Sequence, residues 1–458
     1  MPYCHCVAAT ASDAFFFHYF MSATATVSDP NRKHLETART LIAKGDLKQA
    51  ALTLNKAQRQ APNDPRVFML VGLMAEKSGN IDGAFEALRR SVSLAPDWGP
   101  GLLELALLLA RQNQFQEAIE TAEKVAALEP SNLQVLAGVI DIAHRAGHTE
   151  MAIRHLRRGL GLVPHDPALR KLLARDLGSL GQHAEAIALW AELALDHPDD
   201  IEAQLGHIQA CIAGGQPALA TTNADRLLNM APGNAVYSYY ADLTHGKTPP
   251  HQPPAISQSL FDGMAEVYDQ HMVRGLRYQL PKQIAEKIIT LYPDKKLNVL
   301  DLGCGTGLLG VCLGQLDGFL IGVEISRRMI EQATRHGVYA RFHTVDLLDA
   351  LRETPDATYE VITALDTFTY VGDLTQAVPN AYRILVPGGH LMFSGEIASE
   401  DGPDLVLQAN NCYAHKRSHI EKLCKSAGFD VVEVQDTVLR FENNAPINGF
   451  VVIAHKPA

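Results

Sequence analysis

Residues 299–307 read VLDLGCGTG, and this stretch decides the fold of the second half of the chain. A short apolar run contains an acid, Asp301, and is followed by Gly303, Gly305 and Gly307 at alternate positions. Such apolar runs are typical of buried parallel strands, and glycines after a strand allow the backbone to lie directly against a ligand. The stretch therefore predicts a strand, a tight ligand-binding turn and then a helix.

The glycine spacing disfavours two common phosphate-binding motifs. The dinucleotide fingerprint reads G-x-G-x-x-G, and the P-loop ends in a lysine followed by serine or threonine. Here the spacing is G-x-G-x-G, and no lysine follows Gly307. A pyrophosphate favours helix N–H groups and positive charge. The acid at Asp301 instead suits a ligand that carries an amine or a positive charge.

Three later apolar runs also lead to an acid. Residues 319–324 end at Glu324, residues 339–346 end at Asp346, and residues 359–366 end at Asp366. An acid after the second strand of a doubly wound sheet is placed to accept hydrogen bonds from ribose hydroxyls. The order of these runs predicts four parallel strands whose ends surround one nucleoside-like ligand.

Together, the turn and the acids resemble class I S-adenosylmethionine methyltransferases, whose first motif has the form (D/E)-x-G-x-G-x-G. Residues 383–391, RILVPGGHL, resemble the R-x-L-x-P-G-G turn of that family. The resemblance covers residues 257–458. It implies a doubly wound, Rossmann-like domain that binds S-adenosylmethionine and transfers its methyl group.

The resemblance also implies which residues bind the cofactor. Asp346 is expected to contact the adenine amino group, and Leu347 is expected to lie against the ring. Tyr268 and Tyr278 are candidates for the methionine end, although aromatic residues at helical spacing also fit the buried face of a lid helix. No metal is expected. The expected cofactor-binding residues are Asp301, Gly303, Gly305, Gly307, Glu324, Asp346, Leu347, Asp366, Tyr268 and Tyr278.

Asp366 and His415 are the candidate catalytic bases, with Glu396 and His271 as further options. A base is needed only when the methyl acceptor arrives protonated. Asp366 also fits a role in positioning the cofactor or a loop, and His415 also fits a residue that caps a helix backbone. Residues 364–368, ALDTF, differ from the N-P-P-(Y/F) motif of enzymes that methylate planar nitrogens, which disfavours such an acceptor.

Residues 31–234 repeat with a period of 34. A glycine or asparagine ends the first helix of each unit in a left-handed conformation, an alanine allows two helices to approach, and a proline starts the next turn. This is the tetratricopeptide (TPR) pattern, and six units predict an α-solenoid. The three marker positions are Gly45, Gly79, Asn113, Gly147, Gly181 and Gly215; Ala50, Ala84, Ala118, Ala152, Ala186 and Ala220; and Pro62, Pro96, Pro130, Pro164, Pro198 and Pro232.

The 458 residues are too many for one hydrophobic core, and they divide into four predicted segments. Residues 1–30 are a disordered leader, and residues 31–245 hold the six TPR units and a capping helix. Residues 246–256 are a proline-rich linker, and residues 257–458 are the methyltransferase domain. Proline pairs in the linker predict a stiff, extended segment that spaces the two domains.

Composition limits the cellular setting. A formal net charge of −11 argues against nucleic-acid binding, which usually shows a basic surface. Seven scattered cysteines without a CxxC pair indicate a reducing compartment, and we expect a cytoplasmic protein. Cys4, His5 and Cys6 lack the further ligands that a tetrahedral metal site needs. No segment has the length and apolarity of a membrane helix.

The sequence leaves the methyl acceptor open. A first hypothesis is a protein, peptide or carrier-bound acceptor presented by the concave face of the repeats. A second is a small-molecule O- or N-methyltransferase whose repeats serve assembly into a homo-oligomer. A third is an inactive adaptor, which the intact glycine turn with Glu324 and Asp346 disfavours. The chain resembles bacterial TPR–methyltransferase fusions, with a catalytic part similar to the Williams–Beuren-region type.

Overall fold

The computed structural model describes residues 29–408, 410–442 and 445–458, which form two compact units, 29–196 and 197–458. Most of the predicted leader lies outside the described residues, as do Cys4, His5 and Cys6. None of the helices in the described ranges is long and apolar enough to cross a lipid bilayer.

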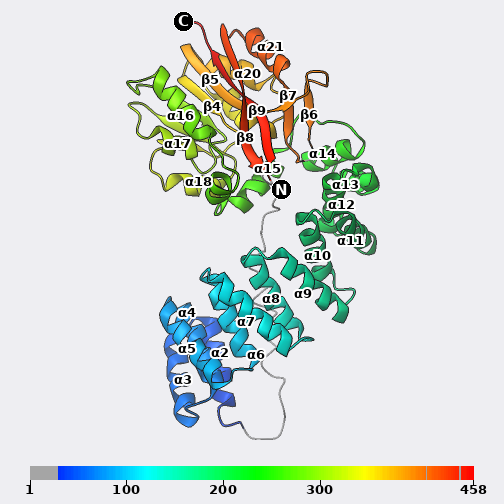
Figure 1. Cartoon of the computed structure of the whole chain (residues 1–458), viewed down its shortest axis with the longest axis vertical. Coiled ribbons are helices and arrows are strands. Elements are labelled where there is room, and N and C mark those ends of the chain that lie inside the picture. Colours follow the sequence, from blue (N-terminus) through cyan, green and yellow to red (C-terminus); the bar gives the residue numbers. More distant parts are fainter. Residues whose placement is uncertain (1–28, 409, 443–444) are drawn as a thin grey trace. The chain divides into compact units, whose positions relative to one another are not determined.

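The first unit consists of antiparallel helix pairs stacked in chain order (Figure 1). Its helices are α2 (Arg32–Lys44), α3 (Leu47–Gln60), α4 (Pro65–Lys77), α5 (Ile81–Leu94), α6 (Gly99–Arg111), α7 (Phe115–Leu128), α8 (Leu133–Arg145), α9 (Thr149–Leu162), α10 (Pro167–Ser179) and α11 (His183–Asp196).

The local geometry of each repeat follows the sequence pattern. Gly45 has a φ of 81° and Asn113 has a φ of 59°, so glycine and asparagine both take the left-handed conformation after a first helix. Ala50 and Ala118 are fully buried where two helices meet. The predicted positions of these helix ends are therefore confirmed. One continuous apolar cluster, from Ala38 to Ala186, runs through the stacked pairs.

The second unit begins with the last repeat. It contains α12 (Ile201–Ala213), η2 (Pro217–Ala220), α13 (Thr221–Met230) and α14 (Ala235–Thr244), and α14 is the predicted capping helix. Residues 246–253, here called the connecting segment, lead into α15 (Pro254–Met264), η3 (Gln270–Gly275) and α16 (Leu280–Leu291). The last three residues of the predicted linker, 254–256, therefore already belong to a helix.

Among the described residues of this unit, nine strands form one sheet. The strands β3, β2, β1, β4 and β5 lie in that order and are parallel, as a doubly wound sheet requires. Strand β9 pairs antiparallel with β5 and β8. The bounds are β1 (Val299–Leu302), β2 (Leu320–Val323), β3 (Arg341–His343), β4 (Tyr359–Ala364), β5 (Leu385–Ala398), β6 (Leu405–Leu407), β7 (Tyr413–Lys416), β8 (Val431–Glu442) and β9 (Ala445–His455).

Helices cover both faces of the sheet (Figure 1). They include α17 (Leu308–Leu313), α18 (Arg327–Thr334), α19 (Leu347–Glu353), α20 (Ala377–Ile384) and α21 (Arg417–Ala427). Because side chains of a strand alternate between faces, Leu300 packs in the cluster with α20 and α21, and Val299 packs in the cluster with α16 and α17. This two-sided burial explains why β1 reads as an uninterrupted apolar run apart from Asp301.

Two strand ends differ from the sequence expectation. Strand β3 has only three residues, and Asp346 stands beyond it as the N-cap of α19, with its side chain accepting from Leu348 N–H and Asp349 N–H. Strand β4 ends at Ala364, so Asp366 lies in the loop after the strand. Both acids still follow the carboxyl ends of parallel strands, where ligands of such sheets bind.

Candidate active site

The glycine turn joins β1 to α17 in a left-handed path. Gly303, Gly305 and Gly307 have φ values of 66°, 53° and 85°. A Cβ on Gly303 would lie 2.5 Å from Thr367, whereas a Cβ on Gly305 would meet only a Tyr268 ring carbon, at 3.9 Å. Gly303 is therefore required for packing against the loop after β4. Gly305 instead leaves its side open toward a pocket, as expected where backbone approaches a ligand.

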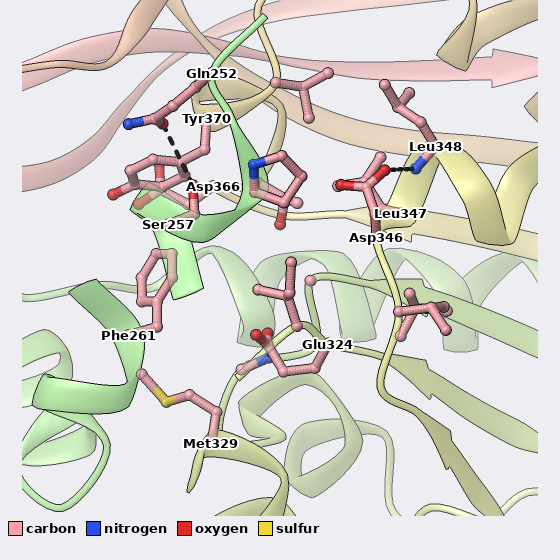
Figure 2. A pocket seen from close by; sticks show the side chains of 18 of the residues that line it. Gln252, Ser257, Phe261, Glu324, Met329, Asp346, Leu347, Leu348, Asp366 and Tyr370 are labelled. Atoms are coloured by element: carbon pink, nitrogen blue, oxygen red, sulfur yellow. Dashed lines mark hydrogen bonds between the residues drawn. The ribbon is translucent and has the colours of Figure 1, made fainter. Parts of the chain in front are cut away.

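A pocket lies beside this turn, at the carboxyl ends of β1, β2 and β4. The pocket, together with the open space at its mouth, encloses about 810 Å³. Figure 2 shows Glu324 and Met329 on one wall, Asp346 to Leu348 on a second, and Gln252, Ser257, Phe261 and Tyr370 on a third. Of the predicted cofactor-binding residues, the pocket is lined by Gly303, Gly305, Glu324, Asp346, Leu347, Asp366 and Tyr268.

Glu324 is held through both of its carboxylate oxygens. One carboxylate oxygen accepts the N–H of Gly305 at 3.0 Å, and the other accepts the N–H of Ser326 at 2.8 Å. Burial raises the pKa of Glu324, and these backbone N–H groups oppose that rise. The acid therefore connects the glycine turn to the start of α18, with its carboxylate in the pocket wall.

Asp301 lies below the turn and does not line the pocket. Its carboxylate accepts the hydroxyl of Tyr339 at 2.7 Å and that of Thr363, also at 2.7 Å. Burial raises the pKa of Asp301 to about 6, and the two hydroxyls oppose this rise. Gly307 also lies outside the pocket, where a Cβ would meet the Tyr339 ring at 3.0 Å. The structure thus places Asp301 and Gly307 where they support the turn.

Asp366 reaches the pocket from a left-handed backbone, with a φ of 53°. Its carboxylate is bound by the guanidinium of Arg440, 2.9 Å away. Tyr268 lines the same pocket, whereas Tyr278 is buried behind it at 6% exposure. Burial, followed by the charge of Asp366, raises the pKa of both tyrosines above the ordinary value. Both hydroxyls are therefore neutral hydrogen-bonding groups at physiological pH.

The other candidate bases lie outside the pocket lining. His415 is 2% exposed, and its Nε2 lies 2.6 Å from the carbonyl oxygen of Gly372, so the ring donates its proton there. Burial lowers the pKa of His415. Glu396 is buried on β5 and bound to Arg440, and His271 lies in η3.

The connecting segment forms a wall that sequence reasoning missed. His251 and Gln252 line the pocket, and His251 forms a β-bridge with Gly372. The carbonyl of Pro250 accepts the N–H of Asp373 at 2.8 Å, and that of Pro249 accepts the Tyr413 hydroxyl at 2.9 Å. The proline pairs alone predicted an extended spacer. A local sequence pattern carries no information about hydrogen-bond donors as distant in the chain as Asp373 and Tyr413.

Helix α15 and the residues that follow it continue this wall, and both are fixed to the sheet side of the pocket. The hydroxyl of Ser326 donates to Asp262 at 2.6 Å, and the hydroxyl of Thr306 donates to Asp269. The rings of Phe261 and Tyr370 meet edge to face, with centroids 5.1 Å apart. The helical spacing of apolar residues around Phe261 indicates a residue on the buried face of a helix. No local sequence pattern indicates that Tyr370 lines the pocket.

The polar side chains of the pocket suit a nucleoside that carries positive charge. Its lining contains the carboxylates of Glu324, Asp346 and Asp366 and contains no lysine or arginine. Carboxylates accept hydrogen bonds from sugar hydroxyls and attract cations, whereas a phosphate would be repelled. The open side of Gly305 and the apolar side chains beside Asp346 suit a close, partly apolar ligand such as S-adenosylmethionine. Within the described ranges, no group of three or more His, Cys, Asp or Glu residues could hold a metal ion.

Family models match both parts of the chain. Residues 276–434 match a model described as a methyltransferase domain, and residues 35–97 and 109–175 match two tetratricopeptide repeat models. The methyltransferase match covers strands β1 to β7 and the start of β8, and the repeat matches cover most of the first unit.

Curated relatives that the chain resembles are O-methyltransferases. A ubiquinone biosynthesis O-methyltransferase of Paracidovorax citrulli is 25% identical over 162 residues, which are 32% of this chain and 68% of that protein. One from Coxiella burnetii is 28% identical over 141 residues, 30% of this chain and 57% of that protein. A malonyl-[acyl-carrier protein] O-methyltransferase of Halalkalibacterium halodurans is 29% identical over 178 residues, 37% of this chain and 64% of that protein.

Among solved structures, the [4+2]-cyclase SpnF is 16% identical with a TM-score of 0.38, covering 46% of this chain and 98% of that chain. PilF of Pseudomonas aeruginosa is 16% identical with a TM-score of 0.36, covering 47% of this chain and 97% of that chain.

Proposed function

The chain contains a methyltransferase domain preceded by tetratricopeptide repeats, and we propose that it transfers the methyl group of S-adenosylmethionine to an acceptor recruited by the repeats. The observation that carries the proposal is the pocket beside the glycine turn. It joins the open side of Gly305 to the carboxylates of Glu324, Asp346 and Asp366, without a lining lysine or arginine.

In this proposal Glu324 accepts hydrogen bonds from the ribose hydroxyls, and Asp346 and Leu347 hold the adenine. Gly303 and Gly305 shape the turn that receives the methionine half. Asp301 and Gly307 do not contact the cofactor and instead support the packing of the turn. Tyr278 likewise lies outside the pocket lining, whereas Tyr268 lines the pocket. When bound, S-adenosylmethionine supplies a methyl group on a sulfonium leaving group, so the protein itself needs no covalent chemistry.

We infer that catalysis depends on orientation and on exclusion of water more than on a dedicated base. Asp366 is engaged by Arg440, and His415 donates its ring proton to Gly372 rather than into the pocket. Holding two reactants in line contributes on the order of 7–11 kcal/mol in favourable intramolecular reactions. An acceptor that arrives deprotonated, such as a phenolate or a carboxylate, would need no proton acceptor from the chain.

The last repeat supports recruitment over a purely assembling role. Helices α12 to α14 belong to the same compact unit as the pocket. Tyr239 of α14 lies beside Tyr413 of β7, whose hydroxyl binds the connecting segment. A protein, peptide or carrier held by the repeats would thus be tethered to the unit that methylates it. A small-molecule acceptor, with the repeats used for self-association, is the alternative.

Binding of the cofactor is tested by calorimetry of the full chain with S-adenosylmethionine and S-adenosylhomocysteine. Glu324→Ala should weaken both by roughly 10- to 100-fold, because hydrogen bonds to a charged group contribute about 1.5–3 kcal/mol. Glu433→Ala is the matched control, since Glu433 is a half-exposed partner of Lys287 and does not line the pocket. Failure of the wild-type chain to bind either ligand would exclude the proposed activity.

Recruitment is tested with methyl-labelled S-adenosylmethionine in a cell extract. The full chain should transfer label to protein or carrier-bound material, and a chain that begins at residue 197 should lose most of this transfer. The truncation point follows the boundary between the two compact units, so the last repeat is kept. Equal labelling by both chains, or label confined to small molecules, would contradict recruitment by residues 29–196.

A further inference from the structure

Arg440 forms a buried ion-pair cluster behind the pocket wall. Its Nη1 lies 2.9 Å from Asp366 Oδ1, and its Nη2 lies 2.6 Å from Glu396 Oε1. The three side chains are 6%, 9% and 2% exposed. Of the three, only Asp366 lines the pocket. The cluster therefore connects a pocket carboxylate to two charged groups in the interior.

Three separate strands supply this cluster. Arg440 comes from β8, Glu396 comes from β5, and Asp366 follows β4. The backbone N–H of Asp366 donates to the hydroxyl of Ser394 at 2.8 Å, which fixes the residue in its left-handed conformation. Aspartate is one of the few residues other than glycine that adopt this conformation readily. The hydrogen bond to Ser394 and the ion pair with Arg440 together determine where the Asp366 carboxylate lies.

The other titratable groups that face the cluster are three tyrosines and one cysteine, and these are neutral at physiological pH. Burial raises the pKa of each facing tyrosine and thiol, with a further contribution from the charge of Asp366. These groups are Tyr268 and Tyr278 between α15 and α16, Tyr370 in η4 (Phe368–Tyr370), and Cys412 ahead of β7. Burial also raises the pKa of Glu396, and Arg440 is the main group that opposes this rise. Arg440 is thus the cation that opposes the cost of burying the Glu396 charge away from water.

We propose that Arg440 is a positioning residue of the cofactor pocket, which binds Asp366 and orients its carboxylate to receive the cationic amino-acid half of the cofactor. This role rests on the proposed function, because it presupposes that the pocket binds S-adenosylmethionine. It assigns a task to a residue that is 74 positions from Asp366 and lies outside the sequence motifs. Two carboxylates share one guanidinium, and a single positive charge cannot cancel two negative charges. The remaining negative charge is then available to attract the cationic half of the cofactor.

Two ligands separate this role from general support of the fold. S-adenosylhomocysteine carries the amino-acid half with its ammonium group, whereas 5′-methylthioadenosine has the same nucleoside without it. Calorimetry of the full chain with both ligands, at about pH 6 and about pH 8, therefore measures recognition of the charged half separately from recognition of the nucleoside.

Arg440→Met should weaken S-adenosylhomocysteine by on the order of tenfold more at about pH 6 than at about pH 8, because buried carboxylates without their cation take up a proton. Affinity for 5′-methylthioadenosine should stay within about twofold of wild type at both pH values. Arg440→Lys should restore most of the pH independence, since it returns a positive charge to the same place.

Arg417→Met is the matched control. Arg417, on α21, also bridges two carboxylates, Glu421 and Asp436, but neither of these carboxylates lines the pocket. It should leave the affinity of both ligands unchanged. If Arg440→Met does not fold, Asp366→Asn provides the test, because it should weaken S-adenosylhomocysteine and spare 5′-methylthioadenosine.

The outcomes are distinct. Equal losses for the two ligands, or wild-type affinity for S-adenosylhomocysteine in Arg440→Met or Asp366→Asn at both pH values, would overturn the positioning role. Failure of the wild-type chain to bind either ligand would instead overturn the proposed function.

Discussion

Gly305→Ala separates the cost of a strained backbone from the cost of filling the pocket. Gly305 has a φ of 53°, and an added Cβ would meet no protein atom closer than a Tyr268 ring carbon at 3.9 Å. Packing alone would therefore tolerate alanine, and the loss of stability comes from the left-handed backbone, about 1–2 kcal/mol. Gly337 is a matched control, because its φ is 65° and an added Cβ there would meet nothing within 4 Å.

Urea unfolding should show similar losses of stability for Gly305→Ala and Gly337→Ala. Calorimetry with S-adenosylhomocysteine should show a loss for Gly305→Ala alone, of roughly tenfold or more, because overfilling a fitted site costs about 1–3 kcal/mol. Gly303→Ala should lose more stability than either, since its Cβ would lie 2.5 Å from Thr367. Unchanged ligand affinity in Gly305→Ala would refute the placement of the cofactor against this turn.

Three further predictions concern buried polar groups. Burial raises the pKa of Glu104 in α6 from 4.5 to about 7, so the folded repeats bind a proton that the unfolded chain has released, and stability falls as pH rises between these values. Glu104→Gln should abolish this fall, of about 3 kcal/mol, in urea unfolding at about pH 4.5 and about pH 8. His415→Gln should lower activity without moving the pH–rate profile, because the ring proton is donated to Gly372; a shifted profile would restore His415 as a base. Tyr413→Phe should leave the carbonyl of Pro249 without its donor, cost about 1 kcal/mol and speed hydrogen exchange in the connecting segment; unchanged exchange would show that this bond does not anchor it.

The repeats could be predicted in detail because their signals are local. A glycine or asparagine that ends a helix, and an alanine where two helices cross, each act within one repeat or between neighbours. Gly45 and Asn113 take left-handed conformations, and Ala50 is fully buried, as the period of 34 indicates. In such arrays each unit contacts mainly the next one, so a sequence pattern determines most of the structure.

The sheet could be predicted as far as its strands are continuous apolar runs. Strands β1, β2 and β4 satisfy this, and their parallel pairing follows from helical crossovers. Strand β3 was overestimated because its side chains are largely exposed, and Asp346 became a helix cap instead of a strand end. The first N–H groups of a helix have no partner within the helix, so an aspartate just before the helix accepts a hydrogen bond from them.

The parts that escaped prediction are contacts between distant residues. Tyr413 binds the carbonyl of Pro249 across 164 positions, and Arg440 binds Asp366 across 74. A proline pair stiffens a segment, but its carbonyl groups still accept hydrogen bonds from any donor that the fold brings close. The connecting segment therefore has the composition of a spacer and the contacts of a pocket wall.

These contacts alter what the first acid of the glycine motif does. Both carboxylate oxygens of Asp301 accept hydrogen bonds from hydroxyls of the protein, those of Tyr339 and Thr363. The Tyr339 ring in turn lies 3.0 Å from the place that a Cβ on Gly307 would take. Asp301 therefore sets the shape of the turn, whereas Glu324 presents its carboxylate in the pocket. Two acids with the same local signal, an apolar run before each, thus have different tasks, and the difference comes from whether hydroxyl donors lie within reach.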